Sequence, residues 1–286
     1  MVTDKNTIKY HLQKAVYEAK NGRPGPVWID IPLDIQAALV DESDMNEYIE
    51  PRNPQFDTKI SEVIELLKKA KRPVIIAGNG LRLADSMEDL RMLVENLNIP
   101  LLTTISGVDL IETNHKLFFG RPGILGERAA NFIVQNSDLV IVLGTRLSLR
   151  IVSFNWEYFA REAIKIMVDI DENELNKKTF IPNLKIHSDV KSFLKELNLN
   201  TTSLKLDIKT WLEYCNNIKI KYPTFDKNIL QNSDYVSSYY FPVLLSEKLQ
   251  RDSVLVTGNG IAYTSTFQTF NVRKGDRLFA NVGCAS

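Results

Sequence analysis

The tripeptide Gly-Asn-Gly occurs twice in this chain, at residues 78–80 and 258–260, each time directly after an apolar run. Glycine at such a junction lets the chain turn sharply from a strand into a helix. It also lets a ligand approach the backbone amides of a helix N-terminus, which attract anions. Each copy is therefore either a binding site for a phosphate-bearing cofactor or a tight turn that holds no ligand.

Three polar residues follow other apolar runs and could complete a site with the first tripeptide. Ligands of doubly wound sheets bind beyond the C-terminal ends of the strands. Thr104 offers a hydroxyl, Arg146 can pair with phosphate, and Asp171 can accept a hydrogen bond from a ribose hydroxyl. With Gly78 and Gly80 they predict a cleft for FAD or ADP. Asp171 could equally cap the short helix that follows it.

Two further sequence features bear on which ligand the predicted cleft could bind. Leu83 stands where the dinucleotide fingerprint requires its third glycine, so a standard NAD site is not expected. The string Arg121-Pro122-Gly123 is either a surface turn or a phosphate clamp.

The composition narrows the class of partner. Lys and Arg together number 35, as do Asp and Glu, so nothing in the net charge favours nucleic acid or an anionic membrane. No apolar run approaches the ~18 residues of a membrane span, and the polar N-terminus does not resemble a secretion signal. The distant cysteines Cys215 and Cys284 and the scattered histidines predict a reducing cytoplasm and no metal site in the chain.

Residues 58–198 alternate between amphipathic helices and short apolar strands. We expect helices at 59–70, 87–97 and 127–136 and strands at 74–77, 101–104, 139–143, 164–168 and 184–187, the last at a sheet edge. The strands are continuous runs of Val, Ile and Leu, which is typical of a parallel sheet covered by helices on both faces. The alternation indicates right-handed crossovers. We therefore predict one doubly wound, Rossmann-like α/β domain.

The flanking segments predict pieces of other α/β domains. Residues 1–37 suggest a helix at 4–21 and a strand at 27–31, and residues 237–286 suggest helices at 237–249 and up to 269 with strands at 254–257 and 277–280. Residues 38–57 and 199–236 are predicted linkers, the second with a helix at 209–222. Because a sheet needs several strands, we expect both flanks to be incomplete. Their apolar side chains should then lack cover, among them Leu12, Val16, Val27, Val254, Val256 and Leu278.

Several strings together resemble one enzyme family. Residues 22–36, GRPGPVWIDIPLDIQ, are similar to the end of the pyrimidine-binding domain of acetolactate synthases and related thiamine-diphosphate enzymes. Residues 72–80, 99–104, 137–144 and 168–171 resemble the central domain of the same family. Residues 255–260 and 282–286 resemble the opening of its diphosphate-binding domain. The resemblance covers nearly the whole chain in the domain order of the family.

The resemblance implies a domain division and a cofactor. Residues 1–37 would be the end of the pyrimidine domain, 58–198 the central domain, and 237–286 the start of an incomplete diphosphate-binding domain. Gly258, Asn259, Gly260 and Ser286 would lie on the thiamine diphosphate side. The family decarboxylates a 2-keto acid such as pyruvate and ligates the carbanion to an acceptor, with the cofactor as electron sink. It works as a homodimer or tetramer, and acetolactate synthases serve branched-chain amino-acid biosynthesis.

Other family elements are missing from this sequence. The catalytic glutamate is expected upstream of Met1, and the Gly-Asp-Gly motif that binds Mg²⁺ is absent, so no catalytic or metal residue is assigned and the chain alone is expected to be inactive. Residues 145–150 depart from the Arg-Phe-Asp-Asp-Arg-like run that helps to bind FAD, which leaves FAD open. Alternatives are a relative that acts on another 2-keto acid or a sugar-linked substrate, or a non-catalytic nucleotide-binding remnant.

Overall fold

The computed structural model describes residues 1–51, 56–225 and 235–280. The chain divides into two compact units, Met1–Phe56 and Asp57–Ser286. The predicted cofactor residue Ser286 and parts of both predicted linkers, 52–55 and 226–234, lie outside the described residues. Within the described ranges, no helix is long and apolar enough to cross a membrane.

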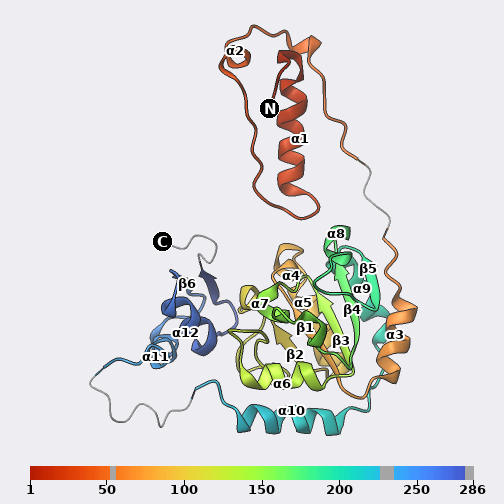
Figure 1. Ribbon diagram of the computed structural model, residues 1–286, viewed down its shortest axis with the longest axis vertical. Coiled ribbons are helices and arrows are strands. Elements are labelled where there is room, and N and C mark those ends of the chain that lie inside the picture. The colour runs from red at the N-terminus through yellow and green to blue at the C-terminus, as the bar shows by residue number, and fades with distance from the viewer. Residues whose placement is uncertain (52–55, 226–234, 281–286) are drawn as a thin grey trace. The chain divides into compact units, whose positions relative to one another are not determined.

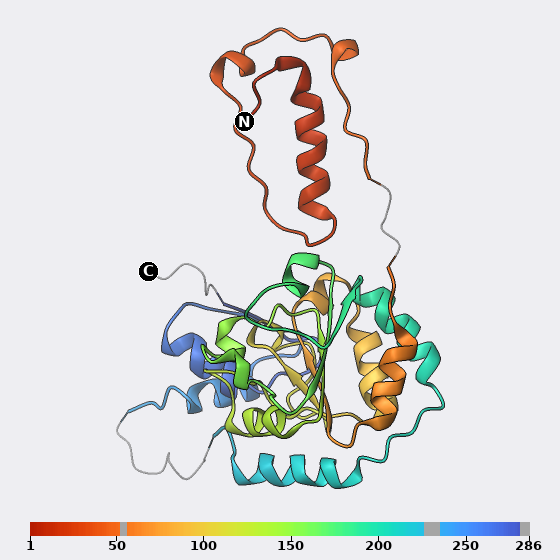
Figure 2. The same cartoon turned by 45° about the vertical axis from the view of Figure 1, so that its right-hand side comes forward.

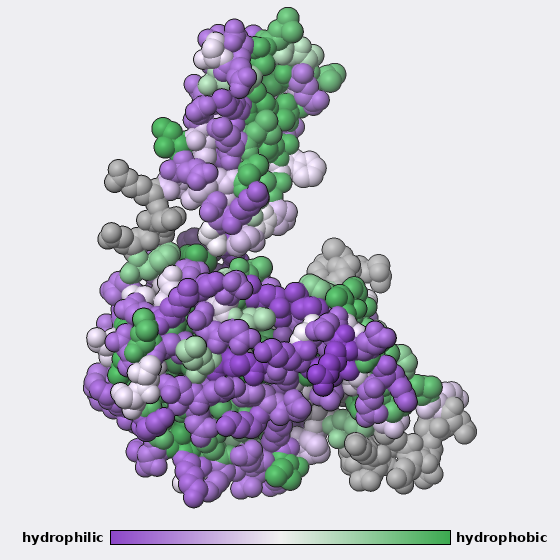
Figure 3. All heavy atoms as spheres, turned by 180° about the vertical axis from the view of Figure 1, so that it is seen from behind, coloured by the Kyte–Doolittle hydropathy of each residue, from purple (hydrophilic) through white to green (hydrophobic). Residues whose placement is uncertain are grey.

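The first unit consists of one helix, α1 (Ile8–Lys20), and the short turns η1 (Lys5–Thr7), α2 (Leu33–Gln36) and η2 (Glu42–Asp44). Its α1 buries no residue, and apolar side chains gather along one side of the unit in Figure 3. Leu12, Val16 and Val27 are 47%, 55% and 45% exposed, as expected.

The strand expected at 27–31 is not formed, and this prediction was wrong. Residues 24–32 have no regular structure, although the Val2 amide donates to the Asp30 carbonyl at 2.8 Å. A strand requires a partner for its backbone groups, and the described part of this unit contains no second strand. The apolar run is therefore present without the ladder that would make it a strand.

The second unit is built around a parallel five-stranded sheet with the order β2-β1-β3-β4-β5. Its strands are β1 (Pro73–Ala77), β2 (Leu101–Thr103), β3 (Leu139–Leu143), β4 (Ile164–Asp169) and β5 (Leu184–His187). The central strands β1 and β3 are buried along their whole length, whereas the edge strand β5 alternates between buried and exposed residues. The predicted doubly wound parallel sheet and its edge strand are confirmed.

Helices pack on both faces of this sheet (Figures 1 and 2). One group contains α3 (Ile60–Lys69), α4 (Gly80–Leu83), α5 (Met87–Leu97) and α9 (Val190–Thr201), and a second contains α6 (Arg128–Asn136) and α10 (Lys209–Lys221). The register aligns Ile75 with Leu101 and Ile141, and all three are buried. Short helical turns follow three strands: η3 (Ile105–Gly107), α7 (Leu149–Val152) and α8 (Glu172–Leu175). A further turn, η4 (Trp156–Tyr158), precedes β4.

The same unit ends in a two-stranded parallel sheet. Strands β6 (Val254–Thr257) and β7 (Arg277–Ala280) form this sheet, and the helices α11 (Tyr240–Lys248) and α12 (Ile261–Thr269) belong to the same segment. Val254 and Val256 are 64% and 70% exposed, as expected for a sheet with one uncovered face. Leu278 was expected to lack cover as well, but it is 6% exposed because it joins Val108 and Phe267 in one apolar cluster.

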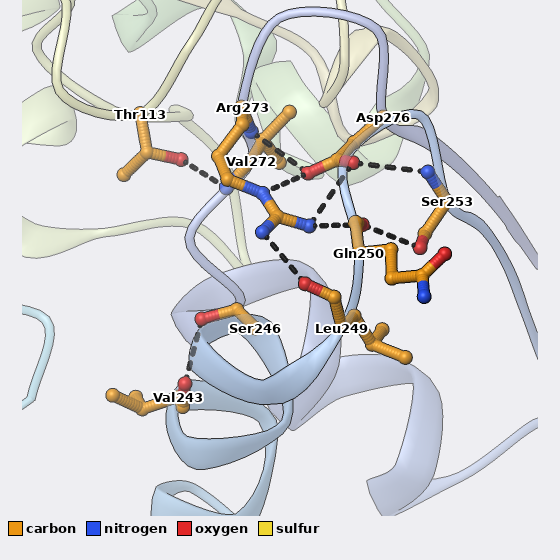
Figure 4. Close-up of polar contacts among 9 residues, drawn as sticks. All are labelled: Thr113, Val243, Ser246, Leu249, Gln250, Ser253, Val272, Arg273 and Asp276. Atoms are coloured by element: carbon orange, nitrogen blue, oxygen red, sulfur yellow. Dashed lines mark hydrogen bonds and ion pairs between the residues drawn. The ribbon is translucent and has the colours of Figure 1, made fainter.

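An ion pair with a buried carboxylate holds the loop before β7 (Figure 4). The Arg273 Nε donates to Asp276 Oδ2 at 2.9 Å, and its Nη1 donates to the Leu249 carbonyl at the end of α11. The Ser253 amide donates to the other Asp276 oxygen at 3.2 Å. Burial acts to raise the pKa of Asp276, but these hydrogen bonds outweigh it, and the pKa lies below its usual value.

A second buried carboxylate connects β7 to the central sheet. The Asp109 side chain, 3% exposed, accepts from Arg277 Nε at 3.0 Å and from the Leu278 amide at 3.1 Å. Its other oxygen lies 2.9 Å from Arg82 Nη2. The two-stranded sheet is therefore fixed to the central sheet by both apolar and charged contacts.

Candidate functional site

The five residues predicted to form a nucleotide cleft all lie at one edge of the central sheet. Gly78 and Gly80 follow β1, Thr104 follows β2, Arg146 follows β3 and Asp171 follows β4. Because all strands are parallel, these positions are at the C-terminal edge, where α4 and α8 also lie (Figure 1). The strand order reverses between β1 and β3, which is the point where doubly wound folds bind ligands.

At that point the first Gly-Asn-Gly turn is closed by the loop after β3. The Gly78 amide donates to the Leu143 carbonyl at 2.9 Å, and the Gly80 amide donates to the Gly144 carbonyl at 2.8 Å. A Cβ on Gly80 would lie 2.7 Å from the Gly144 oxygen and 2.8 Å from its Cα. Both amides are thus engaged by protein, and the glycines allow two backbones to approach each other.

Thr104 extends the closed edge toward β2. Its amide donates to the Ala77 carbonyl at 2.8 Å, and the residue is 5% exposed. A Cβ on Gly107, in η3 just beyond, would lie 3.3 Å from the Ala77 oxygen and 3.4 Å from the Gly78 carbonyl carbon. The loops after β1, β2 and β3 therefore pack directly on one another.

Arg146 and Asp171 each contact residues of α8 rather than the two glycines. The Arg146 guanidinium is 57% exposed and lies 3.6 Å from Glu174, while its carbonyl accepts from Lys177. Asp171 caps α8 by accepting from the Asn173 amide at 2.9 Å. The capping role that the sequence left open is therefore the one observed. A ligand-binding role for these five residues stays a prediction.

The second Gly-Asn-Gly turn is open. It connects β6 to α12, and Gly260 caps the helix with a φ of +69°. Apart from the adjoining residues of the chain, no atom of a described residue lies within 4 Å of a Cβ built on Gly258 or Gly260, and both glycines are exposed. The first amides of α12 point out of a helix N-terminus, where an anionic group is favoured. A phosphate-binding role for Gly258, Asn259 and Gly260 stays a prediction.

Sequence reasoning missed a buried ion pair between Arg121 and Glu127. The Arg121 Nη2 lies 2.6 Å from Glu127 Oε1, and the two side chains are 3% and 4% exposed. Glu127 also accepts from the Arg121 amide, and the Glu127 amide donates to the Arg121 carbonyl at 2.8 Å. Arg121 is therefore not in a surface turn. The signal in the sequence was a pair of opposite charges on either side of Pro122-Gly123.

Comparison with known proteins assigns the fold to a family. Residues 60–197 match the family of the thiamine pyrophosphate enzyme, central domain. The acetolactate synthase large subunit of Corynebacterium glutamicum is 32% identical over 269 residues, which cover 91% of this chain and 42% of the relative. The chain belongs to the acetolactate-synthase-like thiamine pyrophosphate enzymes.

Two further relatives of this acetolactate-synthase-like chain come from distant organisms. The acetolactate synthase large subunit of Lactococcus lactis subsp. lactis is 34% identical over 95% of this chain and 47% of its own length. A probable acetolactate synthase large subunit of Methanococcus aeolicus is 36% identical over 70% of the chain and 36% of the relative. The chain thus spans less than half the length of these relatives.

Proposed function

We propose that this chain is part of a thiamine-diphosphate- and Mg²⁺-dependent carboligase that forms acetolactate from pyruvate. The observation that carries the proposal is the similarity of 91–95% of the chain to proteins named acetolactate synthase large subunit. That similarity extends across both the central sheet and the open turn at residues 258–260. It favours this activity over a nucleotide-binding remnant, which would need only the central sheet.

The open turn fits the diphosphate group of the cofactor. Gly258 and Gly260 leave space against the backbone, and the N-terminus of α12 supplies amide donors to an anion. When bound, thiamine diphosphate supplies the electron sink that stabilises the carbanion after decarboxylation. The residues of this chain would bind and orient the diphosphate, and we assign them no proton transfer.

The described residues fit Mg²⁺ and FAD less well than the open turn fits the diphosphate group. Within the described ranges, no group of three or more His, Cys, Asp or Glu side chains could hold a metal. The amides of Gly78 and Gly80 do not fit a flavin phosphate, because they already donate to the carbonyls of Leu143 and Gly144. Mg²⁺ therefore enters the proposal with no ligands named in this chain. An FAD or ADP at the central edge would have to use Thr104, Arg146 and Asp171.

The rest of the proposal concerns the setting of the enzyme. We expect a homodimer or tetramer in the cytoplasm, a 2-keto acid substrate and a role in branched-chain amino-acid synthesis. The names of the relatives support the last two points, and the expected assembly follows from the family resemblance.

The test is an assay of acetolactate formation from pyruvate by the protein that carries this chain. Turnover should require both thiamine diphosphate and Mg²⁺, and the purified protein should show no flavin absorbance. Turnover of pyruvate that is indifferent to thiamine diphosphate would contradict the proposal. Turnover only with another 2-keto acid or a sugar-linked substrate would move the protein to a neighbouring activity of the family.

A further inference from the structure

Three asparagines of this chain directly precede a glycine: Asn21, Asn79 and Asn259. In such a pair the backbone nitrogen of the glycine can attack the side-chain carbonyl carbon of the asparagine, because glycine has no Cβ to hinder the approach. Asparagine is accordingly one of the thermolabile residues. Whether a given pair reacts depends on whether the fold leaves the glycine nitrogen available.

In the first Gly-Asn-Gly turn the fold restrains the Gly80 nitrogen. Its amide donates to the Gly144 carbonyl at 2.8 Å. On the other side of the same peptide, the Asn79 carbonyl accepts from the amides of Arg82 and Leu83 at 3.0 and 3.1 Å. Ring closure has to turn this peptide toward the asparagine side chain, so it would have to break these hydrogen bonds. The contacts of the closed turn therefore protect Asn79.

The Gly260 nitrogen of the second turn lacks this restraint. No described residue accepts a hydrogen bond from the Gly260 amide. Apart from the adjoining residues of the chain, no described atom lies within 4 Å of a Cβ built on Gly260. Gly260 is exposed and Asn259 is half-buried, so water can reach the pair. The open turn therefore gives access to both the attacking nitrogen and the water that completes the reaction.

We propose that Asn259 is a deamidation site of this protein, whereas Asn79 in the same tripeptide is protected. The Gly260 nitrogen forms a bond to Asn259 Cγ, the bond between Cγ and Nδ2 breaks, and ammonia leaves with the proton of the Gly260 amide. Water then opens the cyclic imide to aspartate or isoaspartate, and no oxidant, reductant or further reactant is needed. The site follows from the contacts of the two turns and does not rest on the proposed function.

The modification places a negative charge beside the N-terminus of α12. Residue 259 directly precedes the N-cap Gly260, at the end of the helix where an anion is favoured. A consequence follows that does rest on the proposed function. The carboxylate at 259 has the same sign as the diphosphate group proposed for this turn, so the modified protein should bind thiamine diphosphate less tightly.

Peptide mapping by mass spectrometry tests the site itself. The purified 286-residue chain is incubated at mildly alkaline pH, with the exposed pair Asn21-Gly22 as a reference. Asn259 should be deamidated at least about tenfold faster than Asn79. In concentrated guanidinium chloride the two rates should agree within about twofold, because unfolding removes the protection. Equal rates in the folded chain, or a faster reaction at Asn79, would overturn the proposal.

Two substitutions test the site and its consequence separately. Asn259→Gln should remove the modification at this position and leave the rate at Asn79 unchanged. Asn259→Asp reproduces the product, and in the protein that carries this chain it should bind thiamine diphosphate about tenfold or more weakly than Asn259→Gln. Equal affinities would overturn the consequence, while the peptide map decides the site. A wild type that does not bind thiamine diphosphate would contradict the proposed function instead.

Discussion

The two Gly-Asn-Gly turns have the same sequence and opposite surroundings. At 78–80 the Gly78 amide donates to the last residue of β3 and the Gly80 amide to the loop after it, and a Cβ on either glycine would clash with that loop. At 258–260, apart from the adjoining residues of the chain, no described atom lies within 4 Å of either Cβ position. The first turn is therefore packed against a neighbouring loop, whereas the second is open among the described residues.

The difference is decided by a distant residue. Gly144, with a φ of +58°, fits its own backbone against Gly80 and Leu81, and a Cβ on it would lie 2.8 Å from the Leu81 amide. Gly78, Gly80 and Gly144 therefore pack together where the strand order reverses. No comparable loop from another strand reaches Gly258 within the described part of the chain.

Substitution at the closed turn should have the largest effect on stability. Gly80→Ala places a methyl group against backbone atoms of Gly144, which cannot move aside as a side chain would. We expect a loss of about 3 kcal/mol in the free energy of unfolding, the upper range for overpacking. Urea unfolding followed by tryptophan fluorescence measures it. A loss below about 0.5 kcal/mol would show that the two loops are not packed as described.

Loss of the Arg273–Asp276 ion pair should have the next largest effect on stability, and this effect should depend on pH. Asp276→Asn should cost about 2 kcal/mol at pH 7, because charge-assisted hydrogen bonds from Arg273 are weakened. The pKa of Asp276 is lowered in the folded chain. The ionised Asp276 side chain therefore contributes fully to the free energy of unfolding above the unfolded pKa of about 3.9. That contribution is lost as the pH falls through the lower, folded pKa.

Unfolding of the wild type and Asp276→Asn at several pH values checks this prediction. The stability difference between them should be constant near neutral pH and should shrink as the pH falls below about 4. A difference that grows on acidification would have the wrong sign for a carboxylate with a lowered pKa.

At the open turn, strain rather than contact should decide the effect of Gly260→Ala. The site has room for a methyl group, but the φ of +69° is unfavourable for any residue with a Cβ. We expect a loss of about 1 kcal/mol in thermal or urea unfolding. A loss as large as that of Gly80→Ala would mean that the second turn is packed as tightly as the first.

Gly258→Ala should have the smallest effect on stability. This glycine has neither a close neighbour nor a positive φ, so the free energy of unfolding should change by less than about 0.5 kcal/mol. The same experiment as for Gly80→Ala measures it. A substantial loss would remove the contrast between the turns.

The strands were predictable where burial alone defines them. The expected strand 139–143 matches β3 residue for residue, because a run of Leu, Val and Ile in the middle of a sheet is buried on both faces. The helix expected at 87–97 also matches α5. The run at 27–31 also contains Val and Ile, but it has no partner strand among the described residues, and a sequence pattern cannot supply one. Helix α9 was overlooked, although Asp189 caps it and Phe193, Leu194 and Leu197 have helical spacing.

The sites were less predictable, because they depend on contacts between distant residues. The sequence placed Gly78, Thr104 and Arg146 at the correct edge of the sheet, since parallel strands end together. It could not reveal that Gly144, more than sixty positions along the chain, closes the turn at Gly80. Nor could it reveal that Arg121 is buried with Glu127. The strand–turn–helix at 254–269 was easier to predict, because it depends on local sequence.

Thiamine diphosphate binding to three variants tests the central claim most directly. Calorimetric titration of the protein that carries this chain, with Mg²⁺ present, would compare the wild type with Gly258→Asp, which adds a repelling charge at the open turn, and with Ser203→Asp, a control at another exposed position. We predict that Gly258→Asp weakens binding by about tenfold or more while Ser203→Asp does not. Equal affinity of Gly258→Asp and the wild type would contradict the assignment of the cofactor diphosphate to this turn.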